Sequence, residues 1–141
     1  MKKTAEIRDE NTPPVQEFPM NLDDALREGM AVDGAIGIAL VDAGSGMLLA
    51  KQGGSSVFDL EVAGAVNTEV LRAKLRAIEA LQLNDSVQDI LVSLEAQYHI
   101  IMPLARNADE QLFLYLALDR ARANLALARH QLRRVEQAIR L

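Results

Sequence analysis

The pattern of hydrophobic and polar residues divides the chain into an irregular leader and a longer part with regular periods. Residues 1–20 contain many charges, three prolines and no sustained period, which predicts an extended or disordered leader. From Asn21 the sequence NLDDALREGM offers a capping Asn followed by two aspartates in the first turn, which predicts a short helix. We therefore expect one folded domain over residues 21–141.

Two extended patterns then enclose a glycine-rich turn. Ile36, Ile38 and Leu40 alternate with smaller residues over 35–42, which predicts a strand with one bulky and one small face. The sequence DAGSG turns the chain into a second strand over residues 47–52. Neither Gly-Lys-Ser nor Gly-Lys-Thr occurs in the chain, and a strand rather than a helix follows the glycines. The stretch is therefore interpreted as a hairpin and not as a phosphate-binding loop.

A long helix is predicted over residues 60–83, and its apolar arc covers well over half of its circumference. The narrow polar face consists of Thr68, Glu69, Arg72, Arg76 and Glu79. Such a wide arc predicts two contacts, one with the sheet and one with a second copy of the chain. We assign to the sheet Val66, Val70, Ala73, Ala77 and Leu81, and to the second copy Leu71, Leu75 and Ile78. The alternative is a helix buried entirely within its own monomer.

Three further strands and a final helix complete the pattern. Strands are predicted over residues 88–94, 97–103 and 111–118, and their short connections favour antiparallel neighbours. The last helix is predicted over residues 119–141 with Asp119 as its cap and one apolar seam. A row of arginines lies beside that seam, and it is either a basic ridge or an ordinary solvated face: Arg122, Arg129, Arg133 and Arg140.

Composition narrows the class of protein. The 141 residues are 50% hydrophobic and include no cysteine, which is consistent with one domain and excludes a disulfide framework. A formal charge of -5 argues against nucleic acid as the main partner, although residues 119–141 carry six arginines against two acidic residues. The charged start does not resemble a signal peptide, and the apolar runs are too short to cross a bilayer. We expect a cytoplasmic protein with no membrane insertion.

Residues that could support catalysis are few. His99 lies in an apolar strand pattern and His130 on the last helix, and neither has a second histidine nearby in the sequence. Ser45, Ser55 and Ser56 lie beside glycines, but no Gly-x-Ser-x-Gly elbow is present. His99 is interpreted as a hydrogen-bonded structural residue. We predict that the protein is not an enzyme and that it requires no metal or cofactor.

The order of elements, taken with particular segments, resembles the roadblock / dynein light-chain family, bacterial branch. The segments are VDGAIGIALVD, GMLLA, DLEVAGAVNTEVLRAKL, DILVSLEAQYHIIMPL and FLYLALDRARANLALARHQL. The resemblance covers about 120 residues and contains no catalytic signature. It implies an α/β (α+β) fold with a five-stranded antiparallel sheet in the order 2-1-5-4-3. The middle helix would lie on one face of that sheet, and the first and last helices on the other.

The resemblance also implies a homodimer in which the third strand pairs with its mate and the two middle helices pack together. The dimer residues would then be Leu71, Leu75, Ile78, Ile90, Val92 and Leu94. Family members commonly bind small Ras-like GTPases or act as dimeric platforms, so we expect a non-catalytic scaffold or regulator of such a GTPase. The partner-binding residues would be Glu69, Arg72, Arg76, Glu79, Arg129 and Arg133.

Two alternatives remain open. The same fold could serve as a small-molecule sensor or as a general protein-interaction module, because a sheet flanked by helices can open a cavity between its layers. A weaker alternative is a membrane-surface protein that uses the basic last helix, which the overall acidity opposes.

Overall fold

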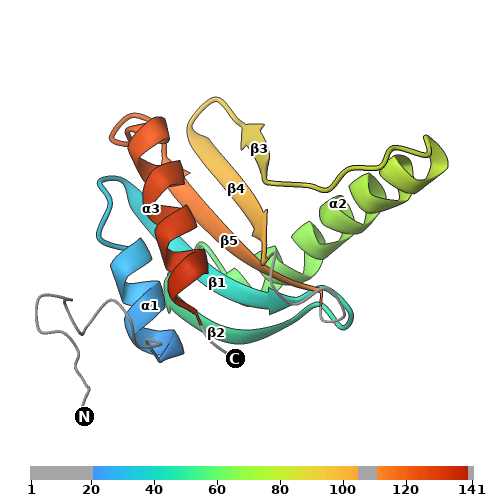
Figure 1. The fold of residues 1–141 in the computed structure, drawn as a ribbon. Helices are drawn as coiled ribbons and strands as arrows, with labels where there is room; N and C mark the ends of the chain where they lie inside the picture. Colours follow the sequence, from blue (N-terminus) through green and yellow to red (C-terminus); the bar gives the residue numbers. More distant parts are fainter. Residues whose placement is uncertain (1–20, 105–110, 140–141) are drawn as a thin grey trace, which may run out of the picture.

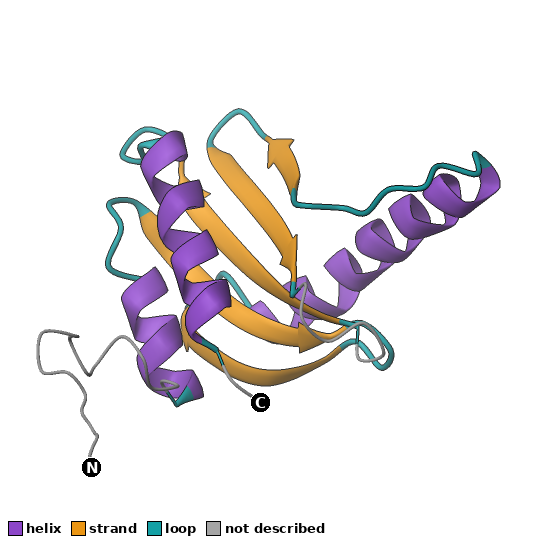
Figure 2. Ribbon diagram, viewed as in Figure 1, coloured by secondary structure: helices purple, strands orange, loops and turns teal. Residues whose placement is uncertain are grey.

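The computed structural model describes residues 21–104 and 111–139, which form a five-stranded sheet with helices on both faces (Figures 1 and 2). The leader predicted for residues 1–20 lies outside the described residues, as does Arg140 of the predicted basic ridge. The elements in chain order are α1 (Leu22–Gly29), β1 (Ala35–Asp42), β2 (Met47–Gly53), α2 (Leu60–Ala80), β3 (Ile90–Ser93), β4 (Gln97–Pro103), β5 (Leu112–Asp119) and α3 (Leu125–Ala138).

The sheet has the strand order β2-β1-β5-β4-β3 and every pairing is antiparallel, as the resemblance implied. Helices α1 and α3 lie side by side on one face, and α2 lies on the other (Figure 1). Each face has its own hydrophobic core, one built around Leu26, Leu114 and Leu132 and the other around Leu71, Phe113 and Tyr115. The central strand β5 contributes to both cores because successive side chains of a strand point to opposite faces.

The predicted start of α1 is confirmed. The backbone N–H of Asp24 donates a hydrogen bond to Oδ1 of Asn21 over 2.8 Å, which satisfies one of the unpaired amides of the first turn. Asp23 and Asp24 occupy that turn, where the helix dipole favours negative charge.

Strand β1 has the predicted bounds, but its alternation is broken at Ile36. Ala35 pairs with Leu118 and Gly37 pairs with Ala117, so Ile36 is one extra residue opposite β5. This bulge reverses the direction of the side chains before it. Ile36 therefore packs with the α2-side core and not with Ile38 and Leu40, which corrects the prediction of one shared bulky face.

Helix α2 faces the sheet with a different side from the predicted one. The buried residues are Leu60, Gly64, Thr68 and Leu71, so Thr68 does not belong to the polar face. A Cβ at Gly64 would lie 2.5 Å from Cδ1 of Leu48 and 3.3 Å from Cγ2 of Val41, so glycine allows the helix to approach the sheet closely here. The Thr68 hydroxyl donates a hydrogen bond to the Gly64 carbonyl over 2.8 Å, which removes the cost of burying it.

The last helix begins at Leu125, six residues later than predicted, and Asn124 is its cap. Asp119 instead ends β5 and accepts a hydrogen bond from the backbone N–H of Ala121 in the turn that follows. Strand β3 is also shorter than predicted, because residues 81–89 form an irregular linker before Ile90. The apolar seam of α3 is confirmed, since Ala128, Leu132, Val135 and Ile139 are buried.

Candidate partner-binding surface

The outer flank of α2 carries large apolar side chains that the chain itself leaves exposed. Val66 is 57% exposed, Val70 is 40% exposed, and Leu81, just beyond the helix, is 66% exposed. These are residues that the sequence assigned to the sheet, so that part of the prediction was wrong: the flank predicted to cover the sheet is the exposed one. Figure 1 shows α2 extending past the sheet, with the linker running back from its end to β3.

Strand β3 lies opposite this flank at one edge of the sheet. Ile90 pairs with Ile101 and Val92 pairs with His99, so these two side chains lie on the α2 side of the sheet, where both are half-buried. An open groove of about 520 Å³ separates α2 from β3 and is lined by Val70, Ala73, Lys74, Ala77, Asp89 and Ile90. The groove combines an apolar helix flank with a strand edge that no other strand of the described chain covers.

Three of the predicted dimer residues lie on α2, and the other three lie in β3 or directly after it. Leu71 is only 2% exposed and packs in the core between α2 and the sheet, so its assignment to an intermolecular contact was wrong. Leu75 is half-buried against the same core, and Ile78 is half-buried. Leu94, just after β3, is 43% exposed, and the roles of Ile90, Val92 and Leu94 in a dimer stay predictions.

Four charged residues of α2 form an exposed ridge. Glu69, Arg72, Arg76 and Glu79 are all exposed, as predicted from the pattern. In the described part of the chain no ion pair joins Glu69 to Arg72 or Arg76 to Glu79. Their charges are therefore directed to solvent and are accessible to a partner.

The two arginines of α3 that were predicted to bind a partner bind an internal carboxylate. Nη2 of Arg129 donates to Oδ1 and Oδ2 of Asp89 over 2.7 Å and 2.9 Å. Nη2 of Arg133 lies 3.6 Å from Oδ2 of the same carboxylate. The Asp89 side chain is only 7% exposed, so it is enclosed between the linker and α3. This contact makes Arg129 and Arg133 less available to a partner than the ridge of α2.

His99 has the structural role predicted for it. Its Nε2 lies 2.7 Å from Oε1 of Gln97, and its Nδ1 lies 3.1 Å from the hydroxyl of Tyr115. Burial lowers the pKa of His99 because the charged form is poorly solvated there. Burial also raises the pKa of Tyr115 to about 12. Both groups are therefore neutral near pH 7, with the Tyr115 hydroxyl donating to His99 and His99 donating to Gln97.

The glycine-rich turn is a hairpin turn. Oδ1 of Asp42 accepts a hydrogen bond from the N–H of Gly44 over 2.9 Å, and the Asp42 carbonyl accepts one from Gly46 over 2.6 Å. These amides are thus used within the turn and do not converge on a site for phosphate.

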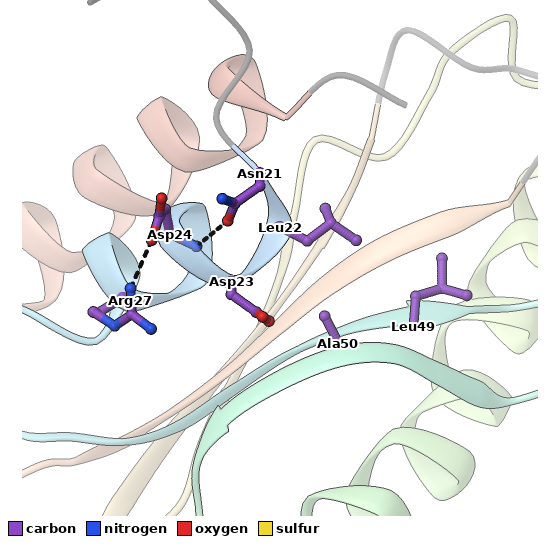
Figure 3. Close-up of a pocket in the computed structure, with 7 residues that line it drawn as sticks. All are labelled: Asn21, Leu22, Asp23, Asp24, Arg27, Leu49 and Ala50. Atoms are coloured by element: carbon purple, nitrogen blue, oxygen red, sulfur yellow. Dashed lines mark hydrogen bonds and ion pairs between the residues drawn. The ribbon is translucent and has the colours of Figure 1, made fainter.

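A second open groove, of about 460 Å³, lies where the first turn of α1 faces β2 (Figure 3). Its polar groups are already engaged, because Asn21 caps the helix and Nη1 of Arg27 lies 2.7 Å from Oδ1 of Asp24. Leu22, Leu49 and Ala50 form its apolar wall (Figure 3). Nothing in this groove provides a nucleophile with an adjacent base.

Within residues 21–104 and 111–139, no three side chains of the ligand types His, Cys, Asp and Glu come together as a metal site. None of the described helices combines the length and the hydrophobicity that crossing a bilayer requires.

The sequence did not reveal the contact of Asp89 with α3, nor which of the two apolar flanks of α2 is exposed. Asp89 and Arg129 are 40 residues apart, and no local pattern links them. The sequence did contain a signal for the side of α2 that faces the sheet. At spacings of four, three and four residues, one side of the helix carries Gly64, Thr68, Leu71 and Leu75.

No family model and no curated protein matches the sequence. Solved structures do match it. The roadblock/LC7 domain from Streptomyces avermitilis is 12% identical with a TM-score of 0.70, and the match covers 84% of this chain and 93% of that one. The gliding protein MglB from Thermus thermophilus is 18% identical with a TM-score of 0.69, covering 84% of both chains. An MglB with a tetrameric arrangement is 19% identical with a TM-score of 0.68, again covering 84% of both chains. The chain therefore has the roadblock/LC7 fold.

Proposed function

We propose that the chain is a non-catalytic, homodimeric scaffold or regulator that binds a small Ras-like GTPase. The observation that carries the proposal is the groove that Val70 of α2 and Ile90 of β3 line, beside a strand edge that no other strand of the described chain covers, with Val66 and Leu81 exposed on the same flank of α2. Large apolar side chains gathered beside such an edge are typical of a protein–protein interface.

A second copy of the chain fits this surface in two ways. Pairing of β3 with the β3 of the mate would continue the sheet and satisfy the backbone groups of the edge. Packing of the two α2 helices would cover the apolar flank that the monomer leaves in water. The MglB with a tetrameric arrangement shows that a protein of this fold self-associates, which supports the same property here.

The GTPase is assigned to the charged ridge of α2. In the proposed dimer the ridge of Glu69, Arg72, Arg76 and Glu79 is doubled by the twofold axis, and its arginines have no intramolecular partner in the described structure. The surfaces of Ras-like GTPases around their switch segments present acidic and apolar groups, which these arginines complement. Arg129 and Arg133 are second candidates, because Asp89 already neutralises them in part.

Regulation would act through differential affinity. A dimer that binds one nucleotide state of the GTPase more tightly than the other shifts the population toward that state, whereas equal affinity shifts nothing. This mechanism requires no catalytic residue of the chain itself. MglB from Thermus thermophilus, which has the same fold, is named as a gliding protein. This is consistent with a role of the chain in a regulated cellular process.

The test measures binding to the Ras-like GTPases encoded in the same genome, each loaded with GDP or with a non-hydrolysable GTP analogue. We expect the wild-type dimer to bind one GTPase in a nucleotide-dependent manner. The double variant Arg72→Glu, Arg76→Glu should remain folded and dimeric but bind at least tenfold more weakly, a loss of about 1.4 kcal/mol, with the association rate most affected.

The matched control is Arg134→Glu, which reverses an exposed arginine on α3, across the sheet from the ridge. It should leave GTPase binding unchanged. Wild-type protein that binds none of these GTPases in either nucleotide state would contradict the proposed partner and favour a sensor role for the fold.

A further inference from the structure

Asp89 is the last residue of the linker between α2 and β3, and it directly precedes β3. Residues 83–89 have no regular secondary structure, and β3 is only four residues long. A short edge strand held by one neighbour is weakly fixed by its own backbone hydrogen bonds. The tight turn to β4 holds the far end of β3, where the N–H of Leu94 donates to the Gln97 carbonyl over 2.8 Å, so the end that joins the linker is the one that a further contact can fix.

The structure provides that fixing point across the sheet edge. Arg129 and Arg133 are four residues apart on α3, so both side chains lie on the same side of the helix and reach one carboxylate. Arg129 binds both oxygens of Asp89, and Arg133 lies beside one of them. A carboxylate that is only 7% exposed is costly to leave without these partners, so the contact is favoured over solvation of the linker.

The register of β3 determines which side chains face the groove. In the observed register Ile90 and Val92 lie on the α2 side, while Leu91 packs in the core that β3 shares with α3. A slip of one residue would exchange these faces and direct Leu91 and Ser93 toward the groove. A contact that holds Asp89 therefore helps to keep the apolar side chains of Ile90 and Val92 on the α2 side.

We propose that Asp89 is a positioning residue of the dimer edge, which Arg129 and Arg133 hold so that β3 is presented to a second copy in one register. This inference rests on the proposed dimer through β3. It also gives α3 a role in self-association, although α3 and α2 lie on opposite faces of the sheet (Figure 1). Arg129 and Arg133, which are second candidates for binding the GTPase, would thus also support the dimer through the strand edge.

The experiment compares Asp89→Asn, Arg129→Gln and the double variant with two matched controls. The control Asp85→Asn removes an exposed carboxylate from the same linker, and Arg134→Gln removes an exposed arginine from the same helix. For each full-length protein, sedimentation gives the dimer dissociation constant and hydrogen exchange gives the protection of the amides of residues 90–93.

We expect Asp89→Asn and Arg129→Gln each to raise the dimer dissociation constant at least tenfold and to increase amide exchange in β3. The double variant should be no worse than the single ones, because both remove the same contact. The controls should match wild type in both measurements.

The two proposals fail in different ways. If wild type is a dimer and the Asp89 variants share its dissociation constant and β3 exchange, Asp89 has no positioning role, even if the melting temperature falls. If wild type is monomeric at every concentration, the proposed dimer is wrong, and this role of Asp89 fails with it.

Discussion

The hydroxyl of Thr68 donates a hydrogen bond to the carbonyl oxygen of Gly64 over 2.8 Å, on the side of α2 that faces the sheet. The bond satisfies the hydroxyl inside the helix, so a polar residue can lie in the buried row while Val66 and Val70 point outward. The exposed apolar flank is thus a consequence of how Gly64 and Thr68 pack, and it gives the surface from which a dimer is inferred.

Thr68→Lys tests this orientation of α2. Thr68 is 2% exposed, so we expect the lysine to lower the free energy of unfolding by about 2 kcal/mol or more, since its charge has no partner in the core. The control is Glu69→Lys at the neighbouring exposed position, which should change stability by less than about 0.5 kcal/mol. Urea unfolding measures both, and equal effects would contradict the observed orientation of α2.

Gln82→Gly should stabilise the end of α2. Gln82 has a φ of 57°, in the left-handed region that costs a residue with a Cβ roughly 1 kcal/mol, and it follows the C-cap residue Leu81. The backbone N–H of Leu83 bonds to the carbonyl of Ile78 over 3.1 Å, as in the usual glycine-terminated helix end. We expect a gain of about 0.5 to 1 kcal/mol in thermal or urea unfolding.

The same change at Gln88, an exposed linker residue whose φ is not positive, is the control for Gln82→Gly. It should give no gain, because glycine there only increases the freedom of the unfolded chain. If both variants are stabilised, or if neither is, the left-handed conformation of Gln82 does not lower the stability of the wild type.

The lowered pKa of His99 predicts that the stability of the protein depends on pH. Burial lowers its pKa in the folded state below 6.5, so between the two pKa values the unfolded chain binds more protons than the folded one. The contribution of His99 is therefore complete above pH 6.5 and is lost as the pH falls toward the lowered pKa, by at most about 1.4 kcal/mol per pH unit.

His99→Gln removes this titration and provides the comparison. The free energy of unfolding is measured for wild type and variant at pH 7.5 and pH 5.0, and the difference between the two proteins removes the shared effect of the carboxylates. Wild type should lose more stability than the variant on acidification. Equal losses would mean that His99 has the same proton affinity in the folded and unfolded chain.

Local signals in the sequence were sufficient for several elements. The cap at Asn21 and the bounds of β1 and β4 followed from capping chemistry and alternation, whereas the order of the strands came from the resemblance to a family. The start of α3 was misplaced because Asp119 and Asn124 are both good caps, and only the packing of the turn at Asp119 decides between them.

The candidate surface was less predictable than the fold. Two apolar flanks on α2 were recognised, but hydrophobicity alone cannot tell which flank a single sheet buries when both are apolar. The close approach at Gly64 decides it, and this contact involves Val41 and Leu48 from other elements. The contact of Asp89 with Arg129 and Arg133 joins residues that are far apart in the sequence, so no local pattern could predict it.

Self-association through the groove between α2 and β3 can be decided by the mass of the protein in solution. Light scattering and sedimentation are applied from high to low micromolar concentration to wild type and to the double variant Val66→Glu, Val70→Glu. The control Val57→Glu makes the same change at a valine that is 92% exposed outside the groove. We predict twice the mass of one chain for wild type and for the control, and the mass of a folded monomer for the double variant, because its carboxylates would be buried without partners in a dimer. A wild type with the mass of one chain at every concentration, or a double variant that stays dimeric, would contradict self-association through this groove.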